Sequence, residues 1–169
     1  MVRETRYYNN GDRYDGDLTG EKRNGQGTYT FANGNRYEGQ WKNDTYDGKG
    51  IFYWKDGSKY DGNWKNGKKE GKGVYTTPNG VRYDGNWSND QYNGKGIYTW
   101  SDGARYDGEF KSNKFNGNGL MDWNKNGRID ASDVLITELF QKELDDNKKI
   151  PQENLNVENN DNYNEKEKR

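Results

Sequence analysis

The side chains that could do chemistry in this chain are carboxylates, hydroxyls, lysines and tyrosines. The 169 residues include no Cys and no His, which excludes cysteine nucleophiles, thiolate or His-ligated zinc sites and Ser-His-Asp catalysis from this sequence. Paired carboxylates could support glycoside hydrolysis, but the Asp and Glu residues recur at regular intervals beside Arg and Lys, and the pattern implies no cleft. We therefore predict a protein that is not an enzyme and has no small-molecule substrate.

One group of oxygen-bearing residues has the spacing of a calcium loop. The run Asp-x-Asn-x-Asn-Gly-x-Ile-Asp-x-x-Asp begins at Asp122 and resembles an EF-hand or dockerin-type loop, in which Gly at position six allows the sharp turn. Because Asp replaces the usual Glu at position twelve and the entering helix is missing, we expect weak Ca²⁺ binding, with a Kd of about 10⁻⁵ to 10⁻³ M. A lengthened hairpin turn is the alternative interpretation. The predicted ligands are Asp122, Asn124, Asn126, the carbonyl of Arg128, Asp130 and Asp133.

Most of the chain is organised by a repeat of 23 residues. Tyr-Asp-Gly or Tyr-Glu-Gly recurs five times at this interval, and two residues after each of these glycines comes a bulky apolar side chain. A Gly-x-Gly follows later in each unit, and a further Gly lies three residues before each Tyr. Five aligned columns of this kind indicate a repeat architecture. The repeated tyrosines are Tyr14, Tyr37, Tyr60, Tyr83 and Tyr106.

Each repeat is predicted to form a β-hairpin. Tyr29 and Phe31 alternate with small polar residues, Asn33-Gly34 is a turn signal, and Tyr37 and Trp41 alternate with charged residues. A period of two places these four rings on one face of the sheet. Because Gly in the middle of a strand weakens it, we expect an aromatic ring to lie across the backbone at the glycine between each Tyr and Trp.

These residues resemble the MORN (membrane occupation and recognition nexus) repeat over roughly residues 5 to 121. The resemblance implies an all-β fold, an elongated single-layer antiparallel sheet of stacked 23-residue hairpins with an aromatic-lined groove. We assign residues 1–121 to this array, as five full repeats with partial ends. The resemblance also implies either a protein-binding role or a peripheral association with membranes and phosphoinositides.

Beyond the array, the sequence pattern changes. Residues 122–133 hold the calcium-loop motif, and residues 132–147 have the periodicity of an amphipathic α-helix. We predict that this helix caps the open end of the sheet, the alternative being a helix that binds a partner. Residues 151–169 are rich in Asn and Glu without periodicity, and we predict a disordered polar tail.

The aromatic columns have two interpretations. Aromatic residues make up 15% of the chain, and their rings can stack on one another in place of an aliphatic core. Since a single layer cannot hide both of its faces, we also expect a groove that binds an extended or helical peptide of a protein partner. The predicted groove residues are Tyr37, Trp41, Trp54, Tyr60, Trp64, Tyr83, Trp87, Trp100, Tyr106 and Phe110.

The charges are nearly balanced, with 27 Lys and Arg against 28 Asp and Glu. This balance argues against a nucleic-acid partner, whereas an anionic membrane lipid stays the alternative to a protein. A column of basic residues precedes the acidic column of the repeat by two positions, and we expect ion-pair ladders across the strands. Neither a signal peptide nor an apolar spanning segment is seen in the sequence, from which we expect a cytoplasmic location.

Overall fold

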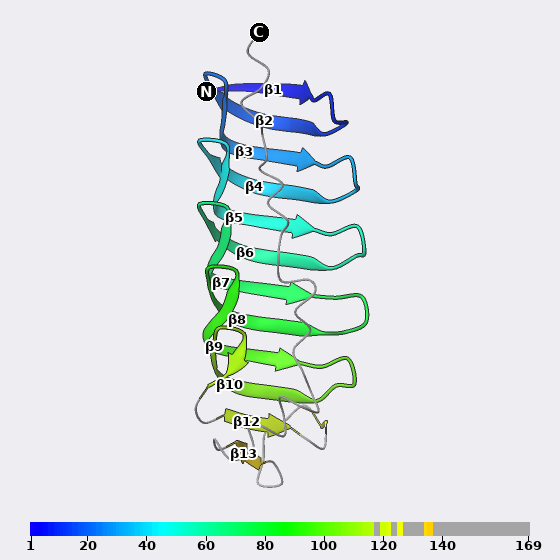
Figure 1. The fold of residues 1–169 in the computed structure, drawn as a ribbon, viewed down its shortest axis with the longest axis vertical. Helices are drawn as coiled ribbons and strands as arrows, with labels where there is room; N and C mark the ends of the chain where they lie inside the picture. The colour runs from blue at the N-terminus through cyan, green and yellow to red at the C-terminus, as the bar shows by residue number, and fades with distance from the viewer. Residues whose placement is uncertain (117–118, 123–124, 127–133, 137–169) are drawn as a thin grey trace.

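The computed structural model describes residues 1–116, 119–122, 125–126 and 134–136. These residues form one antiparallel sheet of 13 strands (Figure 1). No helix occurs among the described residues. The strands are β1 (Val2–Tyr7), β2 (Arg13–Thr19), β3 (Lys22–Thr30), β4 (Arg36–Lys42), β5 (Thr45–Tyr53), β6 (Lys59–Lys65), β7 (Lys68–Thr76), β8 (Arg82–Ser88), β9 (Gln91–Thr99), β10 (Arg105–Lys111), β11 (Lys114–Phe115), β12 (Gly119–Asp122) and β13 (Val134–Ile136).

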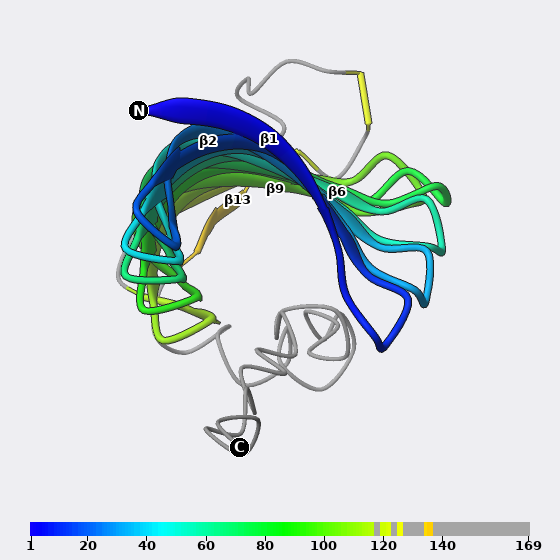
Figure 2. The same ribbon diagram turned by 90° about the horizontal axis from the view of Figure 1, so that it is seen from above.

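The order of the strands in the sheet follows the order in the chain from β1 to β10, then β12 and β13, while β11 pairs only with β10. The predicted all-β single-layer sheet is therefore confirmed. Seen from above, the strands curve around the long axis, so the sheet has a concave and a convex face (Figure 2). Each pair of strands adds about 9.6 Å to the length of the array.

Local sequence explains why the chain turns where it does. Gly34 has a φ of +96° in the turn between β3 and β4, a conformation that glycine adopts without a steric penalty. At the opposite ends of the strands, the two-residue turn Asn43-Asp44 between β4 and β5 has φ values of +48° and +69°. Two consecutive residues with positive φ match the right-handed twist of the flanking strands, and Asn and Asp tolerate this conformation better than most residues.

The Tyr-x-Gly-x-Trp motif is where the backbone and the rings meet. Gly39 lies opposite Gly27 on one neighbouring strand and Gly50 on the other. A Cβ atom placed on Gly50 would lie 2.5 Å from Cζ of Tyr37, because that ring covers the backbone there. The expected ring therefore lies over Gly50, not over Gly39, the glycine between Tyr37 and Trp41. At Gly39 an added Cβ would first meet backbone atoms of Gly50 and Lys49, and the Tyr37 hydroxyl lies 2.7 Å away. The ring is held by its hydroxyl, which donates to the carbonyl of Gln40 at 2.8 Å.

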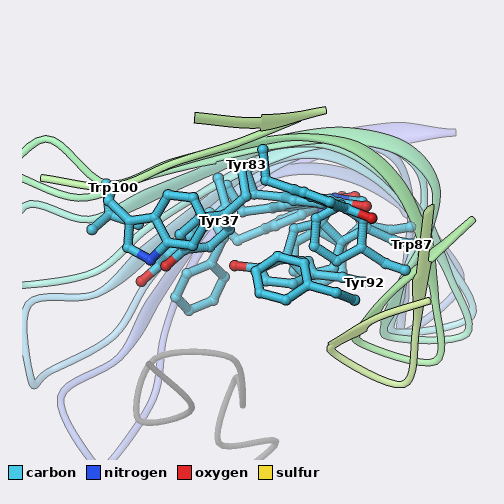
Figure 3. Packing of buried hydrophobic residues seen from close by; sticks show 14 of the residues in the cluster. Tyr37, Tyr83, Trp87, Tyr92 and Trp100 are labelled. Atoms are coloured by element: carbon cyan, nitrogen blue, oxygen red, sulfur yellow. The ribbon is translucent and has the colours of Figure 1, made fainter. Parts of the chain in front are cut away.

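The tryptophan of the motif bonds to the other strand of its own hairpin and packs on the tyrosine of the preceding hairpin. The pairing of β4 with β5 shifts register between Gly39 and Trp41, and Nε1 of Trp41 donates to the carbonyl of Gly27 at 3.1 Å. Tyr37 lies edge-on between Trp41 and Trp64, with ring centroids 5.2 and 5.6 Å away. Edge-to-face packing is a favourable geometry for aromatic pairs. The core is therefore a continuous cluster of mainly aromatic side chains on the concave side of the sheet (Figure 3).

The C-terminal elements differ in part from the prediction. Val134, Leu135 and Ile136, which the periodicity placed in a helix over 132–147, form the strand β13. They pair antiparallel with Gly119, Leu120 and Met121 of β12. Two of the three residues are β-branched, and the pairing satisfies backbone groups on the open side of β12. The remainder of 132–147 and the predicted tail over 151–169 lie outside the described residues.

Candidate binding face

The ten predicted groove residues all belong to, or pack against, one aromatic cluster, but most of them are inside it. Only Trp54 is half-buried. Figure 3 labels Tyr37, Tyr83, Trp87, Tyr92 and Trp100 among the cluster side chains on the concave side of the sheet. The other nine predicted residues are core side chains. The accessible part of the concave face is formed mainly by residues outside the predicted set. The buried nine are Tyr37, Trp41, Tyr60, Trp64, Tyr83, Trp87, Trp100, Tyr106 and Phe110.

The accessible part of the concave face is carried by residues that begin the glycine turns. In each hairpin one residue accepts a hydrogen bond from the amide of the turn glycine three positions later, as Phe31 does from Gly34 at 3.0 Å. Tyr8, Phe31 and Trp54 are partly buried at this position and pack against the core. Because the position repeats with the hairpin, these side chains follow the long axis at intervals of about 9.6 Å. We call this set the ring row: Tyr8, Phe31, Trp54, Thr77 and Trp100.

The ring row has one gap, at Thr77. Its neighbours cover a ring of the following hairpin, as Phe31 covers Phe52 and Trp54 covers Tyr75 at 5.6 Å between centroids. Thr77 has no ring to place over Tyr98, and a hollow of about 250 Å³ opens here. The signal was present in the sequence, because Thr77 breaks a column of rings. The lining residues are Asp56, Ser58, Tyr75, Thr77, Pro78, Asn79, Val81, Tyr92 and Tyr98.

Two basic residues, Arg23 and Lys69, occupy equivalent positions in their repeats on this face. The structure places both cations inside the aromatic cluster. The guanidinium of Arg23 lies 4.4 Å from the Trp41 ring and pairs with Asp44 at 3.0 Å. Nζ of Lys69 lies 5.1 Å from the Trp87 ring, and the side chain is fully buried. Burial lowers the pKa of the Lys69 ammonium to about 8, although the Asp90 carboxylate opposes this shift.

The convex face carries the charges. Arg36 pairs with Glu38 at 3.0 Å and Arg82 with Asp84 at 2.8 Å. These pairs join residues two positions apart along one strand, so the expectation of ladders across the strands is wrong for them: a long Arg side chain reaches the next residue on its own face. Exposed pairs of this kind contribute about 0 to 1 kcal/mol each. Their main consequence is that the basic column is neutralised where it lies.

The predicted calcium loop falls mostly outside the described residues, which include only Asp122 and Asn126 of its six ligands. Asp122 is buried, and its Oδ1 accepts a hydrogen bond from the amide of Lys125 at 2.7 Å. Such a contact is typical of an Asp that stabilises a turn. Within the described part of the chain, no cluster of three or more acidic residues could hold a metal ion. Calcium binding through the six predicted ligands stays a prediction from the sequence.

Comparison with known proteins identifies the repeat. The MORN repeat family matches residues 14–36, 37–59, 60–82, 83–105 and 106–128, which is well over half of the chain. The chain therefore belongs to the MORN-repeat family. No match is found among curated proteins.

One solved structure with a similar chain is the SAS-4 (dCPAP) TCP domain of Drosophila melanogaster, in complex with a proline-rich motif of Ana2 (dSTIL). The two sequences are 11% identical, and the TM-score is 0.45. The alignment covers 80% of this chain and 84% of that chain. At this distance the likeness carries no argument about function.

Membership of the family defines the class of the protein coarsely. MORN-repeat proteins are in general non-enzymatic scaffolds, and their repeats form protein-binding or membrane-associated modules. The described residues contain no helix that is long and apolar enough to cross a membrane.

Proposed function

We propose that this chain is a non-enzymatic scaffold module whose concave face binds an extended peptide segment of a protein partner along the ring row. The observation that carries the proposal is the ring row itself, in which Tyr8, Phe31 and Trp54 stay partly accessible while the rings around them are buried. Aromatic side chains that are rigid, apolar and partly exposed are typical anchors of protein interfaces.

The spacing of the ring row suits an extended partner. Successive members of the row are about 9.6 Å apart, because each hairpin contributes two strands. An extended chain advances about 3.1 to 3.4 Å per residue, so every third residue of the peptide would meet the next member of the row. An α-helix rises about 1.5 Å per residue, and its side chains return to one face after 3.6 or 7.2 residues, at about 5.4 or 10.8 Å. The extended segment is the better match.

The charges favour a peptide over an anionic membrane surface. The basic column of the convex face is paired with carboxylates two residues away. Within the lysine-rich stretch Lys65–Lys72, Lys65 pairs with Asp47 at 3.4 Å and Lys69 is buried inside the ring cluster. Attraction to anionic lipids requires several unneutralised cations on one surface, and these contacts remove two of them.

The first prediction tests the ring row. Random 12-residue peptides displayed on phage are selected against the full chain, and a selected peptide is titrated into the variant Trp54→Ser. We expect a Kd at least tenfold weaker, because an interface aromatic anchor is removed. The matched control is Tyr53→Ser, the preceding residue, whose ring lies under Arg36 at 4.5 Å on the opposite face and whose loss should leave the Kd unchanged.

Circular dichroism of both variants checks that the sheet is intact. A selection that yields no peptide, together with salt-sensitive flotation of the chain on vesicles containing phosphatidylserine, would overturn the proposal in favour of membrane binding. Equal effects of Trp54→Ser and Tyr53→Ser would also contradict a site on the concave face.

A further inference from the structure

The hollow at Thr77 lies where the pattern of the preceding repeats would put an aromatic ring. At the equivalent positions of the two preceding repeats, Phe31 lies 5.9 Å from Phe52 and Trp54 lies 5.6 Å from Tyr75, centroid to centroid. The next pair in this series would join position 77 to Tyr98. Thr77 is too small to make that contact, and the volume of about 250 Å³ is left beside the rings of Tyr75, Tyr92 and Tyr98.

A buried hydroxyl in the lining of this hollow lacks the acceptor that its counterpart has. In the first hairpin the hydroxyl of Tyr29 donates to Oδ2 of Asp12 at 2.6 Å. Tyr98 corresponds to Tyr29 three repeats later, but Val81 stands where Asp12 would be. The Tyr98 side chain is fully buried, and its hydroxyl has no hydrogen-bond partner among the described residues. Buried polar atoms without a protein partner are uncommon in native proteins and usually meet a water, an ion or a ligand group.

Ser58 supplies a second hydroxyl of the same kind. The residue is 1% exposed, and its Oγ likewise has no hydrogen-bond partner in the described part of the chain. Its amide, by contrast, donates to Oδ1 of Asp56 at 2.8 Å, so the backbone is fixed and the hydroxyl is the group left over. The hollow therefore combines aromatic walls with two donors that could reach an acceptor on an incoming group.

Size and charge restrict what could enter. About 250 Å³ is below the usual range of about 300 to 1,000 Å³ for small-molecule sites, so one side chain is a better occupant than a cofactor or metabolite. Asp56 is the one charged residue in the lining. A phosphate or carboxylate would meet a negative charge and no cation, which disfavours a lipid headgroup.

We propose that the hollow at Thr77 takes one aromatic side chain of the bound peptide, and that the hydroxyl of Tyr98 donates to a carbonyl of that peptide. The guest ring would replace the ring that the repeat itself lacks at this position, resting against Tyr75 and Tyr98 as Trp54 rests against Tyr75. This inference depends on the function proposed above, because it specifies what the ring row recognises: an extended segment with an aromatic residue in register with the gap.

The second prediction tests the pocket directly with indole and N-acetyltryptophanamide. Titration into the ¹⁵N-labelled full chain, followed by amide chemical shifts, should give a Kd of about 1 mM, as befits a small ligand in a single-side-chain site. The variant Thr77→Trp should weaken binding of both probes at least tenfold, because its own ring fills the hollow. The matched control is Thr76→Trp, whose neighbours across the strands are Lys59 and Arg82 on the other face, and its affinity should equal that of the wild type.

A second variant keeps the test decisive if Thr77→Trp does not fold. Tyr98→Phe retains the ring and removes the donor, so binding of N-acetyltryptophanamide, which has carbonyls, should weaken about fivefold, while binding of indole stays the same. Failure of the wild type to bind indole at 20 mM, or equal binding by wild type and Thr77→Trp, would overturn the proposal.

The peptide selection separates this inference from the broader function. Peptides that share an aromatic residue and lose affinity for Thr77→Trp support both. Peptides without a shared aromatic residue, or with full affinity for Thr77→Trp, would overturn the aromatic pocket and leave peptide binding on the concave face in place. A selection without any peptide would count against both.

Discussion

Gly73→Ala should destabilise the array by about 3 kcal/mol, a large effect for the addition of one methyl group. A Cβ atom on Gly73 would lie 2.5 Å from Cε2 and 2.6 Å from Cζ of Tyr60, which are closer than any real Cβ contact. The ring cannot move aside easily, since its hydroxyl donates to the carbonyl of Asn63 at 2.8 Å and its edges meet Trp64 and Trp87. Urea unfolding followed by tryptophan fluorescence measures the change.

The control for Gly73→Ala is a glycine with open space around it. Gly20 has a φ of +60°, and nothing lies within 4 Å of a Cβ placed there, so Gly20→Ala should cost only the backbone penalty of about 1 kcal/mol. The double variant Gly73→Ala with Tyr60→Leu should cost less than the sum of its parts, because the second change removes the atoms that the methyl group meets. Additive costs would show that the ring does not press on the glycine.

Replacing the buried cation Lys69 should have the opposite effect: we expect Lys69→Tyr with Asp90→Asn to stabilise the array by about 2 kcal/mol at pH 7. The next repeat already uses this pair of residue types, where Tyr92 stacks on Tyr83 at 3.8 Å and its amide donates to Asn113 at 2.7 Å. In the wild type, the amide of Lys69 donates to Asp90 at 2.8 Å, so the variant keeps the backbone contact and exchanges a buried cation for a stacked ring.

The pH dependence tests the cause of this gain. The pKa of Lys69 falls from an ordinary value of 10.5 in the unfolded chain to about 8 in the folded one. Below pH 8 both states hold the proton, and the folded state bears the full cost of a charge enclosed by Trp54, Tyr60 and Trp87 beside Asp90. Above pH 8 the unfolded state binds more protons than the folded state, so wild-type stability should rise with pH.

Urea midpoints measured from pH 7 to 9.5 should therefore increase for the wild type and stay nearly level for the double variant. The range stops there because burial raises the pKa values of Tyr37, Tyr60 and Tyr83 in the folded state. Their ionisation in the unfolded chain lowers stability near and above pH 10, whatever the state of Lys69. Parallel curves for the two proteins would rule out Lys69 as the source of the pH dependence.

The repeat and its strands could be predicted because their causes are local. A side-chain period of two and glycines or Asn-Asp pairs at turns with positive φ specify hairpins without reference to anything distant. The ring over Gly50 was not predicted at that residue, because Tyr37 and Gly50 lie on β4 and β5 of neighbouring hairpins and meet only when these strands pair. The secondary structure of Val134–Ile136, which was predicted within a helix over 132–147, was harder to predict. These residues are compatible with both a helix and a strand, and pairing with the open side of β12 decides between them.

The sequence by itself determined the period and the face on which each ring lies, since both follow from spacing along one chain. Only the tertiary structure decided which rings are buried. Tyr37 is enclosed by Trp64 from the next repeat as well as by its own Trp41, and such contacts depend on the curvature of the whole sheet. The same packing leaves a hollow beside Thr77, the one small residue of the ring row, because the neighbouring rings keep their positions and no other side chain fills the space.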